Sequence, residues 1–515
     1  MPRQKLKKIT TSVARKQWFF VSYIYMRKIL LILCLLFSLP LTAQPLQELV
    51  EAQMDHPALQ GAWWGGVAAY ADGNTEELFA LRADTRMTPA STLKLLTTAA
   101  ALEKLGPDYR FQTQLYAQTL PDENGVLNGN LYVRGGGDMT LGSKRVKGSK
   151  TYPQVIHEWV QAVQKAGIKQ INGNVVADVS LFEGPTLADK VNWENIGNYY
   201  AAPASALCFH DNLFSVHFKG ELGHGKRVDV KGMSPEIPGV EMESFVTADS
   251  KNKKDNAYVY GGPDQYKLKI FGTIPTTLTG FTIQAAIPNP ALFAVQELTR
   301  QLTEEGIRVS GDAQVLLDAP NYDDMTLLNT HLSPALTDII FIVNKRSFNL
   351  YADMLLRHLA VADGQKGSIK NGLNALAKFL REHNLAQEND FVLYDGSGLA
   401  RDNMLTPRVL LNTLIFMQQS PYFGHYYRSL ATPDDRGDLL VLRRFLKPKQ
   451  SIEKVRIKGG TIDGVKALAG YVPDANGRLI AFVLMANNLA TNKNESLWRM
   501  HENLIKTLME QKAQE

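Results

Sequence analysis

The chain has 515 residues, of which 45% are hydrophobic and 21% charged, a composition that fits a globular protein of more than one domain. Its formal charge of +5 comes from the N-terminus, because residues 1–43 hold eight of the 56 basic residues and none of the 51 acidic ones. The remaining 48 basic and 51 acidic side chains argue against a surface built for nucleic acid.

Residues 1–43 are expected to be a basic extension followed by an export signal. From Met26 the chain runs through Arg27 and Lys28 into an apolar stretch and then the small residue Ala43. That stretch is about 14 residues long, whereas a bilayer-spanning helix needs about 20. A cleaved signal peptide is therefore favoured over a membrane anchor, and a periplasmic protein is expected. Translation from Met1 or from Met26 remains open.

Local patterns after the signal predict a helix over 46–55 and strands over 61–70 and 77–81. A helix is then predicted from P-A-S-T-L-K at 89–94, and Gly106-Pro107 ends it.

The sequence pattern changes in residues 111–284, where short strand-like runs alternate with turns. A polar loop lies at 249–255. This stretch is interpreted as a β-rich insertion, with G-G-G at 135–137 as one of its turns. Helical periodicity resumes at 290–302, 333–345 and 347–359. The last 60 residues predict strands and a C-terminal helix from about 495. We therefore expect an α+β chain in which segments 44–110 and 285–515 share one sheet with helices packed on it.

The stretch P-A-S-T-L-K places Ser91 and Lys94 three residues apart, on one face of a helix. A serine hydroxyl needs a base to become a nucleophile, and an amine whose pKa is lowered by burial can be that base. The N–H groups at the start of the helix could stabilise an oxyanion. The motif alone is weak, because Ser250–Lys253 and Ser451–Lys454 repeat it and Ser91 could simply cap its helix.

Two further motifs favour the catalytic interpretation of Ser91 and Lys94 over the helix cap. Ser347-Phe348-Asn349 opens a predicted helix, and Lys458-Gly459-Gly460-Thr461 lies on a predicted strand. The order Ser-x-x-Lys, Ser-x-Asn, Lys-x-Gly resembles the penicillin-recognising serine acyltransferases.

The gap of 256 residues between Ser91 and Ser347 selects a branch of these enzymes. With its β-rich insertion the chain resembles the class C low-molecular-mass penicillin-binding proteins, the D-alanyl-D-alanine carboxypeptidase/endopeptidase family. The resemblance covers residues 50 to 510 approximately. Further stretches that match in order are 131–141, 173–182, 199–207, 395–407 and 464–472. It implies a DD-peptidase/β-lactamase-like domain with an antiparallel sheet flanked by helices.

The resemblance also implies catalytic roles. Ser91 would attack the carbonyl of the penultimate D-alanine, and Lys94 would accept its proton. Ser347 would relay a proton to the departing amine, with Lys458 nearby. Asn349 would orient Lys94 and the substrate amide. No metal or organic cofactor is implied, and neither H-E-x-x-H nor C-x-x-C occurs.

Binding roles follow from the same resemblance. Thr461 would complete the oxyanion hole with its N–H and hold the terminal carboxylate with its hydroxyl, next to Gly460 of the Lys-x-Gly motif. Asp178 would approach the diamino acid of the stem peptide. Arg401 would steer a carboxylate, or else form a surface ion pair, and Asp395 is either functional or a turn residue.

Gly459 departs from the family, which usually has Thr or Ser there. Loss of a hydroxyl that contacts a carboxylate costs about 1.5–3 kcal/mol. A weak or inactive homologue that only binds the cell wall is therefore one alternative, and a β-lactamase is another. The expected partners are peptidoglycan stem peptides and β-lactams as covalent inhibitors, with peripheral envelope association. Cys208, the one cysteine beyond the signal, is expected to be structural, like the nearby His210.

Overall fold

The computed structural model describes residues 46–72, 77–220, 223–277, 279–433, 435, 454–490 and 494–512, with side chains from Leu497 onward in the last range. The expected export signal and Ser451 lie outside these residues. The chain divides into two units, and the division along the sequence falls between Ala52 and Gln53. The described part of the first unit is helix α2 (Leu46–Ala52). Everything below concerns the second unit.

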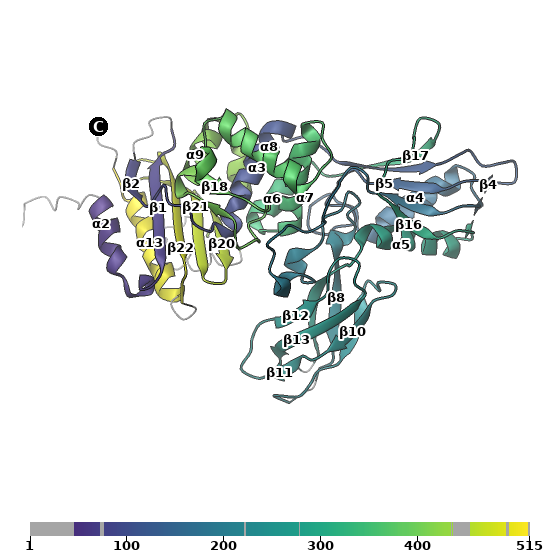
Figure 1. Ribbon diagram of the computed structural model, residues 1–515, viewed down its shortest axis with the longest axis horizontal. Helices are drawn as coiled ribbons and strands as arrows, with labels where there is room; N and C mark the ends of the chain where they lie inside the picture. Colours follow the sequence, from purple (N-terminus) through teal and green to yellow (C-terminus); the bar gives the residue numbers. More distant parts are fainter. Residues whose placement is uncertain are drawn as a thin grey trace, which may run out of the picture. The chain divides into compact units, whose positions relative to one another are not determined.

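Strands from both ends of the chain form one five-stranded sheet, as expected (Figure 1). Its order is β2-β1-β22-β21-β20, and all neighbours are antiparallel. The strands are β1 (Trp63–Tyr70), β2 (Glu77–Leu81), β20 (Arg456–Ile462), β21 (Val465–Pro473) and β22 (Leu479–Asn487). Strands β21 and β22 are buried along nearly their whole length, because helices cover both faces of the sheet.

Figure 1 shows helix α13 (Asn494–Met509) on one face of this sheet, and α3 (Lys94–Leu105) and α9 (Pro407–Gln419) on the other. The other helices in the described residues of this part are α6 (Leu336–Lys345), α7 (Asn349–Ala362), α8 (Ile369–Glu382) and α10 (Phe423–Ser429). Helices α3, α6, α7 and α13 were predicted. Helices α8, α9 and α10 were not.

The inserted part contains two bodies. The first has a sheet of order β16-β7-β5-β3-β17, a smaller sheet β15-β6-β4, and two helices. Its elements are β3 (Gln112–Ala117), β4 (Val126–Leu127), β5 (Leu131–Arg134), α4 (Tyr152–Lys165), β6 (Gln170–Ile171), β7 (Val175–Asp178), α5 (Pro290–Glu304), β15 (Arg308–Val309), β16 (Ala313–Leu316) and β17 (Thr326–Leu332). Helix α4 was not predicted.

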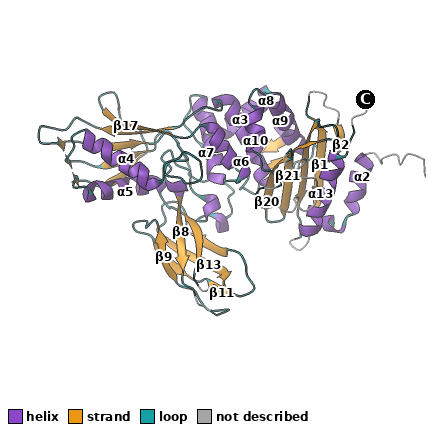
Figure 2. Ribbon diagram, turned by 180° about the vertical axis from the view of Figure 1, so that it is seen from behind, coloured by secondary structure: helices purple, strands orange, loops and turns teal. Residues whose placement is uncertain are grey.

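The second body is almost entirely β, as Figure 2 shows around β8, β9 and β13. It has one sheet of order β14-β8-β9, and a second, β10-β13-β11, in which β12 also pairs with β13. Its strands are β8 (Leu213–Phe218), β9 (Val230–Ser234), β10 (Glu241–Ser244), β11 (Thr247–Asp249), β12 (Asn256–Tyr260), β13 (Lys267–Pro275) and β14 (Phe281–Ala286).

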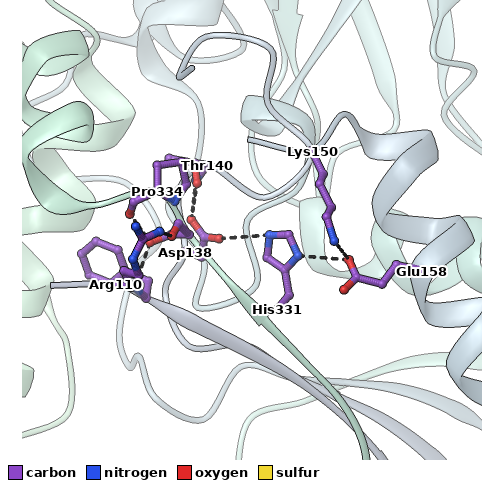
Figure 3. A network of polar contacts seen from close by, with 9 residues as sticks. Arg110, Asp138, Thr140, Lys150, Glu158, His331 and Pro334 are labelled. Carbon is purple, nitrogen blue, oxygen red and sulfur yellow. Dashed lines mark hydrogen bonds and ion pairs between the residues drawn. The ribbon is translucent and has the colours of Figure 1, made fainter. Parts of the chain in front are cut away.

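The expected end of the insertion at residue 284 was wrong. Strand β16 pairs with β7, and β17 pairs with β3, so the insertion extends from about 111 to Leu332. Figure 3 shows the contacts that hold β17 in this body: the imidazole of His331 lies between the carboxylates of Asp138 and Glu158. These partners are more than 170 residues away along the chain, so a local pattern could not reveal them.

Helix α13 is fastened to the central sheet by a buried hydrogen bond. Trp64 Nε1 on β1 donates to His501 Nε2 over 2.9 Å, and His501 is 1% exposed. Burial lowers the pKa of His501 to about 3. The imidazole therefore stays neutral in the folded protein at pH values at which it would be protonated in the unfolded chain.

We expect the free energy of unfolding of His501→Gln to fall less steeply at acidic pH than that of the wild type. Between pH 6.5 and 3 the unfolded state binds a proton at His501 that the folded state does not, so stability falls as pH is lowered through this window. Glutamine keeps an acceptor for Trp64 but does not titrate. Urea unfolding at pH 6, 5 and 4 should give a variant whose loss of stability is smaller than that of the wild type, by a difference that approaches about 1.4 kcal/mol per pH unit well below pH 6.5. Parallel profiles would contradict this account.

Candidate active site

One cleft of about 730 Å³ gathers most of the expected site residues. It is lined by Ser91, Arg145, Asn192, Glu194, Asn195, Tyr199, Tyr200, Tyr258, Gln284, Arg346, Ser347, Phe348, Asn349, Gly398, Leu399, Arg401, Thr461, Ile462 and Asp463. The three motifs and Arg401 thus meet in space, together with residues of the insertion.

Ser91 lies in a 3-10 turn, η3 (Ala90–Leu93), directly before α3. It does not cap the helix: its hydroxyl accepts a hydrogen bond from Lys94 Nζ over 3.0 Å. Ala90 before it has a φ of +46°, an uncommon conformation for a residue with a side chain. Such local strain is typical of functional sites, where the surrounding structure enforces it.

Two glycines let the chain close around Ser91. A Cβ at Gly460 on β20 would lie 2.7 Å from Pro89 O and 3.0 Å from Ser91 N. A Cβ at Gly398 would lie 1.9 Å from Ala90 O. Only glycine permits this approach, which brings β20 alongside the Ser91 N–H where an oxyanion hole is expected.

Lys94 is fully buried and its ammonium has three acceptors. Nζ donates to Ser91 Oγ at 3.0 Å, to Asn349 Oδ1 at 2.6 Å and to the carbonyl of Ser397. Burial lowers the pKa of Lys94 to about 8, although the nearby carboxylates of Asp353 and Asp395 favour the charged form. The amine can therefore become a neutral base near physiological pH.

The two carboxylates beneath Lys94 have different partners. Asp395 is buried, and its carboxylate accepts from the N–H groups of Ser397, Gly398 and Ala400. It is therefore a turn residue, which was one of the two roles expected for it. Asp353 accepts from Gly396 N at 3.0 Å, and burial, together with Asp395, raises the pKa of Asp353 to about 7.

Sequence reasoning missed Asp353. The available signal was its position four residues after Asn349, on the same face of α7.

Ser347 and Lys458 form the second functional pair. Lys458 is 2% exposed, and its Nζ donates to Ser347 Oγ at 2.9 Å and to Gly459 O at 2.7 Å. Ser347 links α6 to α7 with a φ of +57°, which aims its hydroxyl at the lysine at a cost in backbone strain.

Asn349 connects the catalytic pair to the insertion. It is the first residue of α7; its Oδ1 accepts from Lys94, and its Nδ2 donates to Tyr200 O at 2.8 Å. The amide is therefore held at both ends, which fixes the position of its oxygen against Lys94.

Thr461 and Arg401, both predicted to bind a carboxylate, lie in the wall of the cleft. Thr461 is exposed near the end of β20, and its hydroxyl accepts from Lys466 Nζ at 3.1 Å. Arg401 is exposed, next to Gly464.

The assignment of Asp178 to substrate binding was wrong. Asp178 is 1% exposed at the end of β7 and does not line the cleft. Its carboxylate accepts from Tyr322 OH at 2.6 Å and from Ser180 N at 2.8 Å. The motif match gave the position of Asp178 in the chain. It could not show that the carboxylate bonds to Tyr322, which is 144 residues away, and does not face the cleft.

Arg145 is a cleft residue that the sequence did not indicate. Its guanidinium lies 4.3 Å from the centre of the Phe348 ring, next to Ser347, and its Nε donates to Asp211 at 3.0 Å. No local motif marks it, because Arg145 and Phe348 are about 200 residues apart.

Other expectations concern sites elsewhere. Cys208 is buried, and burial raises the pKa of its thiol to about 12, so it is structural as expected. In the described part of the chain, no three His, Cys, Asp or Glu side chains are grouped as metal ligands. Nor does any described helix have the length and apolar character to cross a bilayer.

Comparisons with known proteins identify the family of the chain. The model of the D-Ala-D-Ala carboxypeptidase 3 (S13) family matches residues 46–507. The chain is 27% identical over 461 residues to a D-alanyl-D-alanine carboxypeptidase of an Actinomadura strain, covering 86% of this chain and 81% of that protein. It is also 27% identical over 413 residues to the D-alanyl-D-alanine carboxypeptidase DacB of Haemophilus influenzae, covering 80% and 83%.

The fold is shared as well. A crystal structure of penicillin binding protein 4 from Haemophilus influenzae superposes with a TM-score of 0.76 at 25% identity, covering 88% of this chain and 97% of that one. A second structure of that protein, in complex with a β-lactam, gives a TM-score of 0.71 at 26% identity, with the same coverage. Since the family match spans nearly all of the described residues, the chain belongs to the D-Ala-D-Ala carboxypeptidase (S13) family, as its three motifs predicted.

Proposed function

We propose that this D-Ala-D-Ala carboxypeptidase acts on peptidoglycan stem peptides in the periplasm, through an acyl-enzyme on Ser91. The observation that carries the proposal is the buried contact between Lys94 Nζ and Ser91 Oγ, with the pKa of the amine lowered to about 8. Nucleophile and base are within hydrogen-bond reach, and Asn349 orients the base.

Acylation and deacylation follow from these contacts. Neutral Lys94 takes the hydroxyl proton as Ser91 Oγ attacks the carbonyl carbon of the penultimate D-alanine. The Ser91 N–H and the backbone of β20 stabilise the oxyanion. As the C–N bond breaks, a proton passes through Ser347, which Lys458 holds, to the departing amine. Water then hydrolyses the ester, which releases the shortened peptide and restores Ser91.

The charges of the cleft suit an anionic peptide. Arg145, Arg346 and Arg401 line it, against two acidic residues, Glu194 and Asp463. A stem peptide carries a terminal carboxylate and further acidic groups, so this balance favours its binding. Buried Lys458 adds a fourth positive charge at the hydroxyl of Ser347.

Removal of a terminal D-alanine and cleavage of cross-links use the same acylation step, so both belong to the proposal. A wall-binding module without activity would have no need to keep the Lys94–Ser91 contact, which favours the enzyme. Export by the expected signal peptide is part of the proposal, as are β-lactams as covalent inhibitors.

The first test is Ser91→Ala. Wild-type protein should form a stable adduct with a fluorescent penicillin and release D-alanine from a D-Ala-D-Ala pentapeptide. The variant should lose the adduct and at least about 10³-fold in turnover, while it unfolds at the same temperature as the wild type. Turnover that survives in the variant would rule out Ser91 as the nucleophile, and a rapidly lost adduct would indicate a β-lactamase.

A second prediction concerns pH. Because only neutral Lys94 is a base, the acylation rate (kcat/KM) should rise about tenfold per pH unit and level off above about pH 8. Asp353→Asn removes a carboxylate that favours the protonated amine, so its profile should shift to lower pH. Asp363→Asn, at the other end of the same helix and paired with Lys104, is the matched control and should not shift. A profile that shifts upward in Asp353→Asn would contradict this role for the carboxylate.

A third prediction concerns Gly459. Gly459→Thr restores the hydroxyl that the family usually has at this position and should raise kcat/KM for a substrate with a free terminal carboxylate by roughly ten- to a hundredfold. A substrate whose terminal carboxylate is amidated should gain little. An equal gain for both substrates would show that the hydroxyl acts other than by binding the carboxylate.

A further inference from the structure

A second cavity, of about 400 Å³, is separate from the catalytic cleft and shares no lining residue with it. Both parts of the chain contribute to its walls. The insertion supplies most of the lining, including Phe182, Glu183, Leu317 and Asp318, and the main part supplies Arg357 and Lys366. The volume is within the range of small-molecule sites.

The guanidinium of Arg357 is buried at this cavity without a carboxylate partner among the described residues. The residue is 2% exposed, and its three hydrogen bonds go to the main-chain carbonyls of Glu183, Pro185 and Gly367. Nε has no acceptor. Burial lowers the pKa of Arg357, although the carboxylate of Asp353 acts in the opposite direction. A buried charge of this kind calls for an anionic partner, which a ligand in the cavity would supply.

The charges around the cavity specify the kind of anion. A carboxylate matches the fork of a guanidinium, and Lys366 adds a second, exposed positive charge to the lining. Glu183 and Asp318 are exposed acidic side chains that line the same cavity. They would repel a simple anion, whereas a zwitterion satisfies charges of both signs.

Apolar side chains complete the lining. Phe182 is 8% exposed, but Leu317 is 70% exposed, an unusual position for a large apolar side chain at the wall of a cavity. A ligand with an apolar side chain would remove part of the Leu317 surface from water.

We propose that this cavity binds a free amino acid with an apolar side chain as its zwitterion. Arg357 and Lys366 hold the carboxylate, and Glu183 and Asp318 hold the ammonium group. This site goes beyond the proposed function and does not depend on it.

The bound amino acid would join the insertion to the helix that carries the catalytic amide. Phe182 of the insertion forms an isolated β-bridge with Gly367, and Arg357 lies on α7, which begins with Asn349. The ligand contacts both sides of this junction, so it stabilises the folded chain by binding to it and not to the unfolded chain.

The first test is calorimetric titration of the full chain with L-leucine and with D-leucine, beside two analogues. 4-Methylpentanoate lacks the ammonium group of leucine, and leucinamide lacks the carboxylate. We expect saturable binding of leucine in at least one configuration, binding of both analogues weaker by at least about tenfold, and a Tm that rises with leucine concentration. No binding of either leucine would overturn the site and leave Arg357 as a clamp for main-chain carbonyls. Equal binding of 4-methylpentanoate would overturn the role of Glu183 and Asp318.

Variants of exposed lining residues test the location without disturbing the core. Lys366→Ala and Asp318→Asn should each weaken leucine binding by at least about threefold and keep the Tm of the unliganded protein. Lys370→Ala and Asp324→Asn, which change exposed residues outside the cavity, are the matched controls and should bind leucine as the wild type does. Unchanged binding in both lining variants would overturn the proposal.

A last control excludes the catalytic cleft as the place of binding. Arg401→Ala removes an exposed cation from that cleft and should leave leucine binding unchanged. A loss of binding in this variant would put the amino acid in the catalytic cleft and overturn the second site.

Discussion

The active site is organised around a primary amine buried without a counter-ion in direct contact. Lys94 Nζ uses its three donors on the Ser91 hydroxyl, the Asn349 amide oxygen and the Ser397 carbonyl. Neutral acceptors satisfy the ammonium but do not stabilise its charge as a carboxylate would, so burial lowers its pKa. The same contacts bring nucleophile, base and orienting amide into one place.

The scaffold has to accept strain to keep that amine buried. Ala90 and Ser347, next to the two halves of the site, both have positive φ values, and Gly398 and Gly460 permit contacts that no side chain would allow. The antiparallel sheet supplies the rigidity, because β20 is one of its strands and Lys458 and Gly460 are fixed by the pairing with β21. A site built in this way is pre-organised, since little has to move before acylation.

The insertion contributes to the site and does not merely extend the fold. Its residues make one wall of the cleft, and Tyr200 holds the amide of Asn349. Arg145, fixed by Asp211, lies on the ring of Phe348 beside Ser347. Changes in the insertion can therefore alter substrate choice and the position of the catalytic groups together.

The sequence by itself determined the family, the central sheet from both chain ends, most helices of the main part, and the residues Ser91, Lys94, Ser347, Asn349 and Lys458. These depend on local periodicity and short motifs, and a short motif carries its chemistry within a few residues. Tertiary structure alone decided the rest: the end of the insertion at Leu332, the burial of Asp178 against Tyr322, the carboxylate of Asp353 beneath Lys94, and the wall of the cleft that the insertion builds. Each of these depends on contacts between residues far apart in the chain, and no local pattern encodes which distant side chain will satisfy a buried group or line a cleft.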